Sequence, residues 1–203
     1  MSAKLDLYKL HKSEYVTPKA PALVCMKPAQ YLAISGQGAP GGERFTACIG
    51  ALYGAAFTIK MKRKFAGKQD YAVCKLEGQW FFDGDPATLP KNQWKWKLMI
   101  RTPDFISQAD LKTAVVTLLE RGKSPEVKEV TLETIDEGNC IQMLHVGPYE
   151  KENETVALMR SFAETKGLKL SGPHHEIYLS DPRRVPPERL KTILRVPAPK
   201  QAA

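Results

Sequence analysis

The sequence predicts an α+β domain made of two repeats of a strand–helix–strand–strand unit. Three observations predict it: amphipathic helical patterns at 43–60 and 151–166, alternating strand patterns after each helix, and the same order of elements in both halves. We expect the antiparallel sheets of the two units to join, with the helices on one face and a ligand cleft on the other. Residues 1–24 are expected to form an N-terminal arm, and residues 25–203 a single domain.

The first unit is expected at about 28–104. Its helix carries an apolar stripe at spacings of four and three, formed by Phe45, Ile49, Leu52, Ala56 and Ile59. Strands are predicted at 30–35, 70–78 and 93–100. The last of these alternates cleanly, so that Trp94 and Trp96 share one face.

A linking helix is expected at 107–122, because Ser107 and Asp110 resemble a capping box and Gly122 suits the C-terminal cap. The second unit follows at about 138–197. Its predicted elements are strands at 139–146, 174–179 and 190–196 and the helix at 151–166.

Charge and cysteine content narrow the classes of function. The net charge is +8 and the pI is about 9.3. A protein this basic is a candidate for binding nucleic acid. However, the densest basic run, 60–64, lies at the expected end of a helix, where cations complement the dipole, and no nucleic-acid-binding motif accompanies it. We therefore expect no direct nucleic-acid binding.

The four cysteines are widely scattered, and the sequence has neither an apolar signal core nor a run of membrane-spanning length. These features predict a cytoplasmic protein without a membrane partner.

The segment His174–Pro182 predicts a strand that ends at an Asp-Pro turn. Glu176 and Tyr178 point to one face, and Ile177 and Leu179 to the other. Glu is depleted in strands, so Glu176 requires an explanation. Two explanations stay open from the strand alone: an open, solvated face of the sheet, or a ligand pocket that the Glu lines.

Four segments carry a family resemblance: Ala51-Leu52-Tyr53; Leu76-Glu77-Gly78 with Trp80; 94–105; and 174–183 followed by 187–192. On these residues the chain resembles the GyrI-like small-molecule-binding family, which is related to the effector-binding domains of AraC-type regulators. The resemblance spans about 25–197 and implies the duplicated fold with a cleft at the junction of the halves. It also implies that Glu176 lies inside this cleft among aromatic residues. Gln79 and Phe81 depart from the Leu and Trp of the family pattern.

Stand-alone members that the chain resembles hydrolyse cyclopropane-containing DNA alkylators, sequester drugs or inhibit DNA gyrase. The resemblance therefore implies a small hydrophobic or cationic aromatic ligand. It leaves open whether the protein is a detoxifying hydrolase, a non-catalytic sequestering or sensing module, or a protein that contacts gyrase.

A carboxylate in an aromatic cleft has two uses. It can attract a cationic or electron-poor ring, or it can act as a general base on water. In the second case Glu176 is the base, and Tyr178 hydrogen-bonds a ligand carbonyl. Glu77 is either a second carboxylate of the cleft or a surface turn residue.

The remaining ligand-binding candidates are aromatic. They are Trp94, Trp96, Trp80, Tyr149 and Tyr71. For the tryptophans of the 93–100 strand, the alternatives are cleft walls or packing between sheet and loop. His174 and His175 are adjacent in a strand and face opposite ways, so we expect no metal site and no cofactor.

Overall fold

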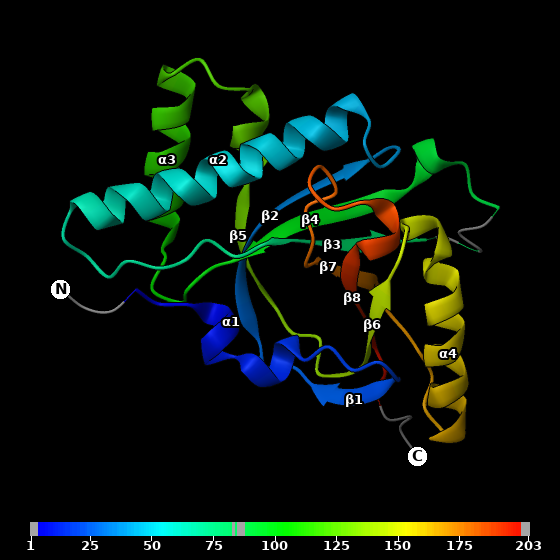
Figure 1. The fold of residues 1–203 in the computed structure, drawn as a ribbon. Helices are drawn as coiled ribbons and strands as arrows, with labels where there is room; N and C mark the ends of the chain where they lie inside the picture. The colour runs from blue at the N-terminus through cyan, green and yellow to red at the C-terminus, as the bar shows by residue number, and fades with distance from the viewer. Residues whose placement is uncertain (1–3, 83, 85–87, 200–203) are drawn as a thin grey trace. The chain divides into compact units, whose positions relative to one another are not determined.

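The computed structural model describes residues 4–82, 84 and 88–199 (Figure 1). Residues 1–3 of the expected arm and residues 200–203 of the expected domain lie outside this range. The described chain forms two compact units, one from residues 4–10 and 29–135 and the other from residues 11–28 and 136–199. The expectation of one domain starting at residue 25 stays a prediction.

The first unit contains an antiparallel sheet with the order β3-β4-β2-β5. Its elements are α1 Leu7–Leu10, β2 Ala29–Gln37, α2 Glu43–Phe65, β3 Leu76–Phe81, η2 Lys91–Gln93, β4 Lys95–Arg101, α3 Gln108–Glu120, η3 Pro125–Glu129 and β5 Thr131–Ile135. Helix α3 begins with the expected capping box of Ser107 and Asp110.

The second unit repeats this arrangement with the order β7-β8-β6-β1. Its elements are η1 Lys12–Tyr15, β1 Ala22–Cys25, β6 Asn139–Val146, η4 Tyr149–Lys151, α4 Glu152–Thr165, β7 His174–Tyr178, η5 Pro187–Arg189 and β8 Lys191–Pro197. The predicted α+β class and the duplicated strand–helix–strand–strand order are confirmed. In each unit a fourth strand adds to the free edge of the first repeat strand: β5 pairs with β2, and β1 pairs with β6.

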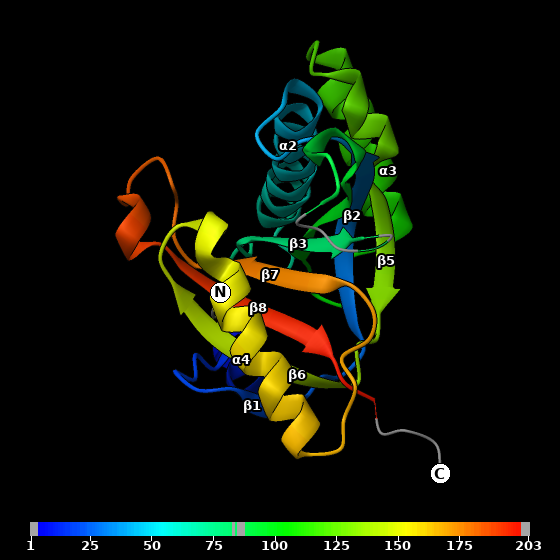
Figure 2. The same cartoon turned by 90° about the vertical axis from the view of Figure 1, so that its right-hand side faces the viewer.

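Each unit has a core between its sheet and one long helix. In the first unit α2 packs Leu52 and Ile59 into a cluster with Leu32 and Trp96. In the second unit α4 covers the sheet (Figure 2), and Met159 packs in a cluster with Ile141 and Leu194. Burial of such side chains contributes about 1.5–3 kcal/mol each, which fixes each helix to its sheet.

Several boundaries differ from the sequence prediction. Helix α2 continues past residue 60 to Phe65 and ends in a Schellman-type cap, in which Lys68 N–H donates to Arg63 O and Gly67 has a positive φ of 68°. The strand expected at 70–78 begins only at Leu76. The strands β1 and β5 were not predicted, because both are short edge strands whose pairing is set by distant parts of the chain.

Candidate functional site

Strand β7 carries the central carboxylate of the predicted site. Glu176 pairs with Leu194 and Tyr178 pairs with Thr192, so both side chains lie on the face of the sheet that α4 covers. The predicted position of Glu176 on the face away from the helix is therefore wrong. The reason is that Ile177, on the opposite face, is also fully buried. Alternation shows which residues share a face, but with both faces buried it does not show which face meets the helix.

Glu176 meets a second buried carboxyl group from the first turn of α4. Glu152 is 7% exposed and Glu176 is 8% exposed, and their side chains hydrogen-bond each other. Burial raises the pKa of Glu152 well above its usual range, and the adjacent Glu176 raises it further. Two carboxyl groups form such a bond only when one of them carries a proton, and the raised pKa of Glu152 makes it the proton donor of the pair.

The Glu152 carboxyl group has few hydrogen-bond partners. Thr192 hydrogen-bonds the Glu152 carboxyl group. Within the part of the chain that the structure describes, however, the Oε1 atom of Glu152 is buried without a hydrogen-bond partner. A buried polar atom without a partner costs roughly 1–3 kcal/mol, so a group that bonds it, such as a ligand or water, would be bound favourably.

Two tyrosines flank the carboxyl pair. Tyr149, in η4 just before α4, packs edge-to-face on Tyr178 with ring centroids 6.0 Å apart. Burial, with Glu176 and Glu152 nearby, raises the pKa of Tyr149 to about 12. Tyr149 is therefore a neutral phenol at physiological pH and can donate a hydrogen bond. The structure thus brings together Glu176, Tyr178 and Tyr149 of the predicted site.

His174 completes a convergent group. Its Nε2 lies 3.5 Å from Glu176 Oε1, and ligand atoms of Glu152, His174 and Glu176 all lie within 4.8 Å of one another. Two carboxylates and an imidazole at this spacing are able to bind a divalent cation. A proton on Glu152 is another way to offset the repulsion between the two carboxyl groups, as its raised pKa indicates. The expected absence of a metal stays a prediction.

The opposite face of β7 holds an ionic network. His175 Nδ1 lies 2.8 Å from Glu137, which also accepts a hydrogen bond of 3.1 Å from Arg195. Burial alone would raise the pKa of Glu137, but His175 and Arg195 outweigh it and lower the pKa to about 2. Arg195 donates further to Gln142 at 2.8 Å and to the carbonyl of Glu14 at 2.7 Å. The prediction that His174 and His175 face opposite ways is confirmed, and His175 anchors β7 beneath the site.

The other predicted ligand-binding residues belong to the first unit. Trp80 and Trp96 are buried in its core, and each packs on Phe45, with centroids 5.8 and 5.2 Å apart. Trp96 lies against Gly36, where an added Cβ would come within 2.3 Å of the ring, so only glycine fits there. Trp94 is half-buried and packs edge-to-face on Trp80 at 5.8 Å.

The two remaining candidates of the first unit lie apart from this aromatic group. Tyr71 is buried and packs edge-to-face on Phe105 at 6.0 Å. Glu77 is fully buried and pairs with Met99, on the face of the sheet opposite α2, so it is not a surface turn residue. Its place in a cleft with Glu176 stays a prediction, as do the ligand-binding roles of Trp80, Trp94, Trp96 and Tyr71.

Three residues of the site were not predicted. Glu152 resembles an ordinary acidic residue in the first turn of a helix, Thr192 an ordinary strand residue, and His174 was assigned to loop hydrogen bonding. One available signal was the apolar pattern of α4, which places Glu152 three and seven residues before the buried Thr155 and Met159 and thus on the buried face.

A duplicated α+β scaffold with a buried carboxyl pair beside two tyrosines belongs to the class of small-molecule-binding domains. A family model described as GyrI-like small molecule binding domain matches residues 20–199. The chain belongs to this GyrI-like family, which confirms the resemblance found in the sequence. No curated protein matches the sequence.

Solved structures support the same assignment. An uncharacterized conserved protein from Listeria innocua is 36% identical over 97% of this chain and 100% of its own, with a TM-score of 0.91. A hydrolase from Listeria innocua is 35% identical over the same shares, with a TM-score of 0.87. The C-terminal domain of EcmrR shares the fold, with a TM-score of 0.58 at 11% identity over 89% of this chain and 97% of its own.

Two further predictions concern the chain's surroundings. Within residues 4–82, 84 and 88–199, no helix is long and apolar enough to cross a membrane. The four cysteines are free, and Cys48, Cys74 and Cys140 are buried. The cytoplasmic location stays a prediction.

Proposed function

We propose that this protein detoxifies small hydrophobic or cationic aromatic molecules, and that it hydrolyses reactive cyclopropane-containing alkylators with Glu176 as the general base. The observation that carries the proposal is the buried Glu152–Glu176 carboxyl pair, which lies next to two tyrosines. The similarity to a protein called a hydrolase, at 35% identity over nearly the whole chain, supports the catalytic part.

The proposed reaction adds one water to the ligand. The Glu176 carboxylate accepts a proton from water while the water oxygen forms a bond to a cyclopropane carbon. The strained carbon–carbon bond breaks, and its electron pair moves into the conjugated dienone, whose oxygen becomes a phenolate. Tyr178 donates a hydrogen bond to this oxygen, and the proton held by Glu176 finally returns to the product. Atoms and charge balance without a redox partner.

Glu152 has a positioning role in this scheme. Its proton is donated to Glu176 in a hydrogen bond, so the pair carries a single negative charge. This bond also orients the Glu176 carboxylate from a helix terminus that is fixed to the sheet by the core around Met159. Replacing Glu152 therefore affects how well Glu176 is placed and not the identity of the base.

Aromatic residues supply the binding energy in this proposal. Tyr149 and Tyr178 offer ring faces beside the carboxyl pair, and contacts of this kind contribute about 0.5–2 kcal/mol each to binding of a cationic or aromatic ligand. In the first unit, Trp94 is the half-buried member of the predicted set and the one we expect to contact ligand directly. Trp80 packs edge-to-face on Trp94 and supports it, while direct ligand-binding roles of Trp96, Tyr71 and Glu77 are less favoured because these side chains are buried elsewhere in the first unit.

The proposal is tested by incubating the purified protein with aromatic cations and with cyclopropane-containing alkylators, and following thermal shift and ligand mass. We expect a ligand that gains the mass of one water with the wild-type protein. The Glu176→Gln variant should bind the ligand and hydrolyse it roughly 100- to 10,000-fold more slowly. The matched control is Glu154→Gln, an exposed acid of the same helix turn as Glu152, which should leave the rate unchanged.

Two results would assign the protein a different function. A ligand that stabilises the protein and keeps its mass would make the chain a sequestering or sensing module, in which Glu176 attracts a cationic ring. Inhibition of gyrase that persists in the Glu176→Gln variant would identify a protein-contact function instead.

A further inference from the structure

The outward face of α2 carries an apolar stripe. Phe57, Met61 and Phe65 recur every four residues and are 50%, 36% and 79% exposed. At about 100° per residue they lie roughly opposite Ile59, which is in the core. Tyr53 stacks on Phe57 at 6.1 Å and continues the stripe. The last turns of α2 are thus apolar on two opposite faces, and only one of them packs on the sheet.

Unpaired cations surround this stripe. The last two turns of α2 carry Lys60, Lys62, Arg63 and Lys64, and Lys68 follows the helix. Two of these five are used internally, since Lys60 pairs with Asp70 at 2.8 Å and Arg63 with Asp110 at 3.5 Å. Lys62, Lys64 and Lys68 are exposed and have no ion-pair partner within the described residues. The apolar stripe therefore has a cationic border.

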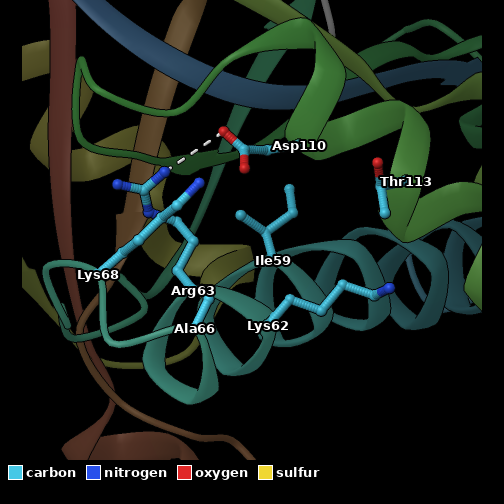
Figure 3. A pocket seen from close by; sticks show the side chains of 7 residues that line it. All are labelled: Ile59, Lys62, Arg63, Ala66, Lys68, Asp110 and Thr113. Atoms are coloured by element: carbon cyan, nitrogen blue, oxygen red, sulfur yellow. Dashed lines mark hydrogen bonds and ion pairs between the residues drawn. The ribbon is translucent and has the colours of Figure 1, made fainter.

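A small basic pocket lies between α2 and α3, on the side of α2 that carries Ile59 and away from the stripe. It has a volume of about 150 Å³ and is lined by Ile59, Lys62, Arg63, Ala66, Lys68, Asp110 and Thr113 (Figure 3). Its three cations, Lys62, Arg63 and Lys68, outnumber its one carboxylate, Asp110. Figure 3 marks the ion pair between Arg63 and Asp110. The Nε atom of Arg63 is buried and has no hydrogen-bond partner within residues 4–82, 84 and 88–199. The excess positive charge of the pocket adds to the cationic character of this end of α2.

We propose that the C-terminal half of α2 docks on an anionic phospholipid bilayer. Phe57, Met61 and Phe65 enter the boundary between headgroups and acyl chains, and Lys62 and Lys64 face the anionic surface. Large apolar side chains bordered by lysines form the composition that binds anionic lipid surfaces. A second copy of the chain would fit less well, because a two-fold contact through this stripe would bring the unpaired lysines of both copies together.

This inference goes beyond the proposed function, because it concerns a surface and not the Glu176 site. It also differs from the sequence expectation of no membrane partner, which considered only segments that span a bilayer. A surface contact would hold the protein where hydrophobic ligands concentrate. It requires no change in the chemistry of the site.

The test is flotation of the full-length protein with vesicles of phosphatidylcholine alone and with phosphatidylglycerol added. We expect binding to the anionic vesicles only, and weaker binding at high salt. Lys62→Ala and Lys64→Ala should each weaken binding about fivefold, whereas Lys112→Ala, an exposed lysine of α3, should not. Phe65→Ser should abolish most of the binding, whereas Leu158→Ser, an equivalent exposed change on α4, should leave it intact.

Three results would overturn the inference. They are equal binding by the Phe65→Ser and Leu158→Ser variants, absence of wild-type protein from the anionic vesicle fraction, and a dimer in light scattering that Phe65→Ser dissociates. The Glu176→Gln variant should float like wild type, so this test is independent of the proposed hydrolysis.

Discussion

Replacement of Glu152 by Gln tests the reasoning about the carboxyl pair most directly. Gln keeps the shape and still donates a hydrogen bond to Glu176, but it cannot titrate. In wild type, the pKa of Glu152 rises from 4.5 in the unfolded chain to about 10 in the folded protein. Between these values the folded state holds one proton more than the unfolded state. Stability is therefore fully present below about pH 4.5 and is lost as pH rises toward 10.

The size of this pH dependence follows from the one extra proton that the folded state binds. One extra bound proton gives a slope of about −1.4 kcal/mol per pH unit in the free energy of unfolding. Between about pH 6 and about pH 8, wild type should thus lose up to roughly 2.7 kcal/mol relative to the Glu152→Gln variant. Comparison with the variant removes the contributions of titrating groups that do not interact with Glu152.

Urea unfolding followed by far-UV circular dichroism at several pH values measures this difference. The control, Glu154→Gln, changes an exposed acid two positions along the same helix and should run parallel to wild type. Parallel pH–stability curves for wild type and Glu152→Gln would refute the shared proton and remove the positioning role assigned to Glu152.

Three further predictions follow from the structure. Glu137→Gln leaves the buried Arg195 without its anion and should destabilise the protein by about 3–5 kcal/mol in urea unfolding, whereas Asp136→Asn beside it is exposed and should change little. Gly36→Ala places a Cβ against the Trp96 ring and should cost about 1–3 kcal/mol, whereas Gly50→Ala meets open space on α2 and should be neutral or stabilising; the reverse order would contradict the packing described. Hydrolysis by wild type should persist after treatment with a chelator, since the proposed base is a carboxylate; loss that zinc restores would assign the Glu152–His174–Glu176 group to a metal.

Local sequence patterns were sufficient for most of the fold. The apolar stripes of α2 and α4, the capping box at Ser107 and the repeated order of elements each depend on residues within a few positions of one another. The edge strands β1 and β5 were not predictable in this way, because their partners lie about 100 residues or more away in the chain.

For the candidate site, too, local sequence patterns predicted one part of the arrangement and tertiary packing decided the other. Alternation along β7 predicted that Glu176 and Tyr178 share a face, and the resemblance to GyrI-like proteins predicted that Glu176 is central. Only the pairing of β7 with β8 decided that this face meets α4. Only the packing of α4 brought Glu152 against Glu176, 24 positions away.

The exposure of the outward stripe of α2 could also be decided only by the tertiary structure. The sequence shows Phe57, Met61 and Phe65 at helical spacing, but such residues usually belong to a core. A helix has one face toward its sheet, and Ile59 and Leu52 occupy it here. The sequence by itself determined the periodicity of each element. The register between elements decided which apolar side chains are buried, which are exposed and which two carboxyl groups share a proton, because burial depends on what the rest of the chain places opposite each face.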